Sequence, residues 1–257
     1  LRNEGAVSRV VSSRVSQSAV SEASRAAESA RSDVVSASSE LSSALVEAMS
    51  RTTSRYQSSN RTSGQSISSV EELGKSADSL RTISEQVAKS TGLSSSQVSQ
   101  IAFQLSGGIG TPGISPIMAN ASGNAGKSYS SNLTEQQQKV ASELTNDQLR
   151  QFRSFADRAT RDQTFASALG AESREGQELA SRLSTATTRV DSAQSVFAER
   201  QAVAKRLSTA YESGEALSID LAQLPANSDF MRRYQRLAAE YGSDSLALQA
   251  AMASELA

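Results

Sequence analysis

The chain of 257 residues contains no cysteine, no histidine and no tryptophan. Without cysteine there is no disulfide framework, so cysteine usage says nothing about the redox compartment. Without histidine or cysteine, zinc and copper sites of the usual kind are excluded. Catalytic arrangements that need an imidazole from this chain, such as Ser-His-Asp and Cys-His, are excluded as well.

Large apolar side chains are also few, because hydrophobic residues make up 37% of the chain and aromatic residues only 4%. Such a chain cannot bury a thick core. We expect it to be elongated, built from thin helix-on-helix contacts, or partly disordered. It has no signal peptide and no apolar run of membrane-spanning length. Because it begins with Leu1, we interpret it as a soluble piece of a longer protein whose anchor lies elsewhere.

Neither sign of charge is in excess, since 26 basic residues nearly balance 27 acidic ones. No long run of one sign appears, as it would in a surface for nucleic acid or an anionic membrane. The acidic stretch near Asp244 is too sparse for a calcium loop and is more typical of a helix cap. We therefore predict no direct nucleic-acid binding, no metal and no cofactor.

The first part of the chain has a helical heptad pattern of small apolar residues, which predicts a long helix to about Gln57. A polar turn is expected at 58–64, followed by a second apolar seam over 70–87 that ends at Gly92. We predict an antiparallel helical hairpin; the alternative is that the alanine-rich seam pairs with another chain. The seam consists of Val20, Ala23, Ala27, Ala30, Val34, Ala37, Leu41, Ala44 and Ala48.

Further helices are predicted after the hairpin. A short helix follows a cap at Ser94 or Ser95, and residues 107–133 form a linker rich in Gly, Pro and Ser. Capping-box patterns begin at Thr134 and Thr145, and a long helix is expected over 174–213. No segment alternates with period two for long enough to predict a strand.

These patterns predict an all-α fold, with an elongated N-terminal long-helix hairpin followed by a C-terminal helical bundle. The hairpin has a coiled-coil-like, alanine-rich seam. The predicted division is 1–106 for the hairpin and short helix, 107–133 for the linker, and 134–257 for the bundle.

The segment ASGNAGKS at 121–128 resembles a phosphate-binding loop, since Gly126, Lys127 and Ser128 match its last three positions. However, Ala121 replaces the first glycine, and Pro116 makes the preceding segment a poor central strand. No helical pattern follows until Thr134, so backbone amides are not set up for phosphate. We favour a flexible joint between two helical parts over a nucleotide site.

Two other kinds of catalytic pattern are weak. No lysine has a serine three residues before it, as a Ser–Lys nucleophile of the S-x-x-K type would require. The Glu-Ser pairs of wall lyases occur at Glu28, Glu172 and Glu212, but such pairs are expected by chance in a serine-rich chain. We interpret all three as solvated helix faces and predict that the chain is not an enzyme.

The segment FMRRYQR at 230–236 is the most basic and aromatic part of the chain, and it allows two interpretations. Aromatic and arginine side chains are typical anchors of protein interfaces, which makes this segment the candidate partner-binding site. The favoured alternative is one helix with Phe230, Tyr234 and Leu237 inward and its arginines outward. The candidate partner-binding residues are Phe230, Arg232, Arg233, Tyr234 and Arg236.

Several segments together resemble the C-terminal soluble region of TraG proteins from F-type conjugative type IV secretion systems. They are the Ser/Val/Ala-rich N-terminal part, GLSSSQVSQIAFQLSGGIGTPG at 92–113, GKSYSS at 126–131 and LTNDQLRQFRSFADRATRD at 144–162. The resemblance implies a periplasmic location, attached to an inner-membrane protein through an N-terminal part. It also implies mating-pair stabilisation, and plasmid exclusion through the inner-membrane protein TraS of a recipient. The family brings no catalytic residues, and the oligomeric state is left open.

Two other classes of protein remain as alternatives. One is a structural coiled-coil protein, such as a phage tail tape-measure segment or a type III secretion translocator. The other is an enzyme, either a P-loop ATPase or a wall lyase.

Overall fold

The computed structural model describes residues 10–62, 68–106, 133–161, 165, 169, 173–220, 229–241 and 244–255. Contacts group the chain into two compact units, one of residues 33–194 and the other of residues 1–32 with 195–257. The helices α1 (Gln17–Thr62) and α7 (Arg174–Ser213) contribute residues to both units. The prediction of an all-α fold is confirmed, apart from one short β-ribbon in the unit that contains the C-terminus.

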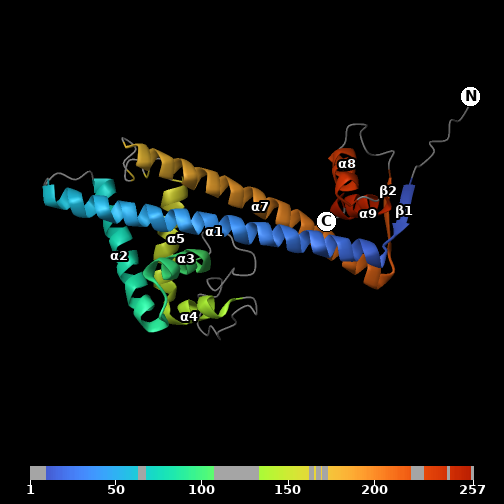
Figure 1. Ribbon diagram of the computed structural model, residues 1–257. Helices are drawn as coiled ribbons and strands as arrows, with labels where there is room; N and C mark the ends of the chain where they lie inside the picture. The colour runs from blue at the N-terminus through green and yellow to red at the C-terminus, as the bar shows by residue number, and fades with distance from the viewer. Residues whose placement is uncertain are drawn as a thin grey trace, which may run out of the picture. The chain divides into compact units, whose positions relative to one another are not determined.

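The described part of the unit of residues 33–194 contains four further helices. They are α2 (Ser68–Thr91), α3 (Ser95–Leu105), α4 (Glu135–Glu143) and α5 (Asn146–Arg161). In Figure 1, α3 and α4 lie below α1, while α2 and α5 cross it. Local sequence signals set several helix ends as predicted, because the capping side chains satisfy amides that no helix carbonyl can reach. Capping boxes form at Ser94 and Thr134, Thr145 accepts from the Gln148 amide at 3.2 Å, and Gly92 ends α2 with φ 73°.

The aromatic centre of this unit joins helices from both sides of the predicted linker. The ring of Phe103 in α3 lies edge-on to Phe152 in α5, with centroids 5.0 Å apart, and Phe155 meets Phe165 at 5.6 Å. All four rings are buried. The contacts therefore do not divide the chain at 107–133, because residues before and after that segment share one core. Residues 107–132, with the segment ASGNAGKS and Lys127, lie outside the described residues.

The first two helices share a core, so the seam of α1 packs within the chain, but α2 crosses α1 steeply instead of running antiparallel beside it as predicted (Figure 1). Ala37, Leu41, Ala44 and Ala48 of α1 are buried in the same core as Leu73, Ala77 and Leu80 of α2. The helix α1 continues to Thr62, so the turn predicted from residue 58 starts too early. Alanines on the seam let the helix axes approach closely, since they carry no side chain beyond Cβ.

Gly74 of α2 packs tightly against Tyr56 of α1 and supports a first prediction. A Cβ atom at position 74 would lie 2.4 Å from Cβ of Tyr56 and 2.5 Å from its Cγ. Replacing a helical glycine by alanine normally gains about 1 kcal/mol, but overpacking costs about 1–3 kcal/mol. We expect Gly74→Ala to lower the free energy of unfolding by about 1–2 kcal/mol in urea denaturation.

Second-site variants test the cause of that loss. In a Tyr56→Gly background, Gly74→Ala should no longer be destabilising relative to Tyr56→Gly alone, because no Cβ remains at position 56 to clash. In a Tyr56→Ala background it should still be destabilising relative to Tyr56→Ala alone, since the clashing Cβ is present. Equal effects of Gly74→Ala in the two backgrounds would show that the close approach is not the cause.

The other unit contains an antiparallel ribbon that the sequence did not predict. Strand β1 (Val10–Arg14) pairs with β2 (Ala216–Asp220) in the register Val10 with Asp220 and Arg14 with Ala216. The expectation of a helical start and of no strand is wrong here. Both strands have only five residues, and each needs a partner some 200 positions away, which local periodicity cannot reveal.

The core of this second unit lies around the helices α8 (Asp229–Tyr241) and α9 (Asp244–Glu255). Phe230 and Leu237 of α8 pack with Leu207 of α7 and Leu217 of β2. The helix α9 contributes mostly alanines, which allows it to come close to α8. Gly214 ends α7 as predicted, with φ 69°.

Candidate functional site

The candidate functional site is a groove of about 870 Å³ between α1 and α7 in the unit of residues 33–194. Its floor holds two buried alanines, Ala44 of α1 and Ala186 of α7, which are 7% and 8% exposed. Its walls carry mainly serine, threonine and charged side chains. The α1 wall consists of Val35, Ser36, Ser39, Glu40, Ser43 and Glu47, and the α7 wall of Ser181, Arg182, Thr185 and Arg189.

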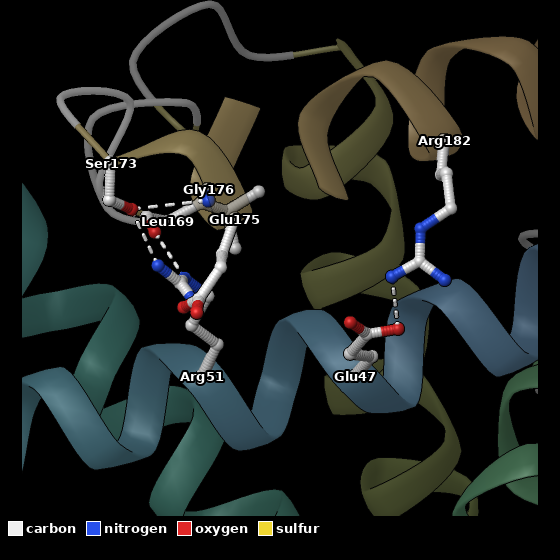
Figure 2. A network of polar contacts seen from close by, with 7 residues as sticks. All are labelled: Glu47, Arg51, Leu169, Ser173, Glu175, Gly176 and Arg182. Atoms are coloured by element: carbon white, nitrogen blue, oxygen red, sulfur yellow. Dashed lines mark hydrogen bonds and ion pairs between the residues drawn. The ribbon is translucent and has the colours of Figure 1, made fainter. Parts of the chain in front are cut away.

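Two ion pairs cross the groove and align the helices antiparallel. Arg189 donates through Nη1 to both carboxylate oxygens of Glu40, at 2.8 and 2.7 Å. Arg182 donates through Nη2 to Glu47 at 2.5 Å (Figure 2). The partners lie seven residues apart on each helix, as in a coiled coil. A shift of α7 by one heptad that set Arg182 beside Glu40 would bring Glu175 next to Glu47, so the charges favour this register.

The two walls of the groove carry opposite charges. On the α1 side, Glu40 and Glu47 are each 51% exposed, and on the α7 side Arg182 and Arg189 are 58% and 60% exposed. Half-exposed pairs of this kind stabilise a fold by only about 0–1 kcal/mol each. Their main effect is therefore on register and on which charges can approach the groove.

At one end of the groove, Arg51 ties α1 to the start of α7 (Figure 2). Its Nε donates to the carbonyl of Leu169 at 2.6 Å, and its Nη2 donates to Oγ of Ser173 at 2.7 Å. The same Oγ accepts the amide of Gly176 at 3.2 Å and so caps α7. Nη1 donates to the exposed carboxylate of Glu175 at 3.0 Å. Since the Arg51 side chain is only 24% exposed, these contacts order the beginning of α7.

The predicted partner-binding segment forms most of α8, in the other unit. Phe230 is 2% exposed in the core, and Tyr234 packs against that core. Arg236 and Arg233 both face Glu199 of α7, at 2.7 and 3.7 Å, and Arg232 is exposed. The interpretation with aromatic residues inward and arginines outward is confirmed. The two aromatic side chains are needed for the core, while partner binding by the arginines stays a prediction.

A more buried ion pair lies beside α8. Nη2 of Arg200 donates to Glu240 at 2.5 Å, and the two side chains are 17% and 33% exposed. This hydrogen bond raises the pKa of Arg200, so the guanidinium stays charged. Burial raises the pKa of the neighbouring Tyr241, whose hydroxyl has no hydrogen-bond partner among the described residues. The phenol therefore stays protonated at neutral pH.

The Glu-Ser pairs that resemble lyase residues lie on solvated faces where the structure describes them. Glu28 is 74% exposed beside Arg31, and Glu212 accepts from Ser208 at the surface. Glu172 lies outside the described residues. Within the part of the chain that is described, no three Asp or Glu side chains come close enough to hold a metal ion. No helix of that part is both long and apolar enough to cross a bilayer.

Neither the groove nor the role of Arg51 is apparent from the sequence. One sequence pattern is consistent with the groove: Glu40 and Glu47 are seven residues apart, and so are Arg182 and Arg189. Nothing in the sequence shows that these two heptads face each other.

Searches against protein-family models, curated proteins and solved structures find no match to the chain.

Proposed function

We propose that this chain is a protein–protein interaction module of a conjugative DNA-transfer apparatus. In this role it acts in mating-pair stabilisation, and in plasmid exclusion through recognition of an inner-membrane partner such as TraS in the recipient. Its place would be the periplasm, as the soluble part of an inner-membrane protein. The support for this context is the resemblance of residues 92–113, 126–131 and 144–162 to TraG proteins.

The observation that best supports an interaction role is the groove between α1 and α7. From Val35 to Glu47 the groove runs about 18 Å along α1, so about three turns of a helix can lie along its outer face. The alanine floor permits close approach of a helix backbone, and the acidic and basic walls select the charges of what enters. Helices that lie in grooves are a common mode of protein recognition.

Long helices also suit a structural coiled-coil protein, the second candidate function. The 46 residues of α1 and the 40 residues of α7 favour it, because long helices serve as rigid spacers in such proteins. A structural role of this kind does not need an open groove. Blocking the groove therefore separates the two candidates.

The test is a bulky substitution in the groove of the donor's protein. Thr185 is exposed and lines the groove, so Thr185→Trp should fill it without touching the core. We expect conjugation frequency to fall by about tenfold or more, because contacts at the centre of an interface dominate binding. Thr188→Trp is the matched control, since Thr188 is exposed on the same helix outside the groove. Unchanged conjugation after deletion of the whole segment would rule the proposed function out.

A further inference from the structure

We infer that the face of the groove is covered by a second copy of this chain, in a parallel face-to-face pairing in which α1 lies over α7 of the other copy and α7 over its α1. The inference rests on the proposed use of the groove for protein binding and identifies its partner. It is carried by the placement of four charged side chains: Glu40 and Glu47 on α1, and Arg182 and Arg189 on α7.

The charges lie in two levels along the helices. Glu40 is level with Arg189, and Glu47 is level with Arg182, because each pair is in direct contact. Both acidic residues lie on α1, and both basic residues lie on α7. The side chains are half-exposed, and a guanidinium has five N–H donors while a carboxylate accepts at two oxygens, so a second partner is possible for each.

A two-fold axis parallel to the helices makes this pattern self-complementary. Such an axis sets α1 of one copy over α7 of the other and keeps every residue at its own level. Glu40 then faces Arg189 of the second copy, while Arg189 faces Glu40 of the second copy. Each level becomes a square of four charges with alternating sign, which is attractive on all four sides. The same holds for Glu47 and Arg182.

The other simple two-fold pairing is repulsive. An axis across the helices sets α1 over α1 of the second copy in the opposite direction. That arrangement brings Glu40 over Glu47 of the second copy and Arg182 over Arg189 of the second copy, so like charges meet at both levels. The charge pattern therefore selects the parallel dimer.

The size of the patch predicts how strong the pairing is. From Val35 to Glu47 the groove runs about 18 Å along α1, and a two-helix face is about 20 Å wide. The pairing would bury about 700 Å² in total, below the range of about 1,200–2,000 Å² for stable complexes. We expect an association that is weak, depends on concentration and is weakened by salt, suited to copies held close together.

Complementary charge variants of the 257-residue chain test this pairing by sedimentation equilibrium, at low salt and up to about 1 mM protein. Variant A carries Glu40→Arg and Glu47→Arg, so all four groove charges are positive. Variant B carries Arg182→Glu and Arg189→Glu, so all four are negative. Each should keep its fold, checked by circular dichroism, because half-exposed ion pairs contribute little to stability.

The expected result is that wild type self-associates, while A alone and B alone associate at least about tenfold more weakly. An equal mixture of A and B should associate at least as well as wild type, since positive and negative grooves then face each other. The quadruple variant, with both changes in one chain, should self-associate again with inverted polarity. Thr185→Trp should weaken the association, while Thr188→Trp should not.

Three outcomes would overturn the inference: a monomeric wild type at about 1 mM and low salt, A and B associating as strongly as wild type, or no association in their mixture. The same experiments test the proposed function independently of this inference. If Thr185→Trp lowers conjugation while wild type is monomeric, the groove binds a different protein and only this inference is lost. If wild type associates as described while deletion of the segment leaves conjugation unchanged, the pairing stands without the proposed function.

Discussion

Phe152→Ala is expected to lower the free energy of unfolding by about 3–5 kcal/mol, the usual cost of removing a large side chain from a well-packed core. Phe152 is fully buried, and its ring lies 5.0 Å from that of Phe103 in an edge-on arrangement. The substitution removes this aromatic contact and leaves a cavity between α3 and α5. Few other large side chains are present in so aromatic-poor a chain to fill that cavity.

Urea denaturation followed by circular dichroism measures this effect. Ser154→Ala is the matched control, because Ser154 is exposed on the same helix and should change stability by less than about 0.5 kcal/mol. A loss below about 1 kcal/mol for Phe152→Ala would contradict the assignment of α3 and α5 to one core. Such a result would favour the division of the chain at 107–133 instead.

Arg51→Ala is expected to lower the free energy of unfolding by about 2–4 kcal/mol, since hydrogen bonds from charged groups contribute about 1.5–3 kcal/mol each. Two of its bonds carry the effect, to the Leu169 carbonyl at 2.6 Å and to Ser173 at 2.7 Å. Without the guanidinium, the carbonyl of the fully buried Leu169 loses this donor. Arg51→Lys should recover only part of the loss, because one ammonium group cannot reproduce the fork of donors.

Hydrogen exchange at the Gly176 amide adds a local measurement to the urea midpoint. That amide donates to Ser173, so its exchange should become faster when Arg51 no longer orders the Ser173 hydroxyl. Glu175→Gln is the control, because the Glu175 side chain is 81% exposed and its ion pair should contribute less than about 1 kcal/mol. Equal effects of Arg51→Ala and Glu175→Gln would show that only the surface ion pair matters.

Several local features were predictable from the sequence because their causes are local. The capping boxes at Ser94 and Thr134 depend on a hydroxyl and a glutamine three residues later, and both form. The buried alanines of α1 follow the heptad pattern for the same reason, since helical geometry alone sets which residues share a face. The inward direction of Phe230 in α8 is predictable on the same ground.

Other features depend on residues that are distant in the sequence. The β-ribbon needs the pairing of Val10 with Asp220, and neither segment carries a strand signal strong enough alone. The charged walls of the groove need α1 and α7 to pack at one register, which no local pattern specifies. Long-range packing likewise places residues from both sides of 107–133 in one core.

The helical character of the chain, many of its helix ends and the chemistries that its missing residue types exclude all follow from local sequence. Those properties follow from hydrogen bonds and periodicities within a few residues. Only the tertiary structure decided that Phe103 and Phe152 share a core, that Arg51 orders the start of α7, and that opposite charges line one groove. These depend on long-range packing, in which small side chains let several alternative helix pairs approach and specific contacts select among them.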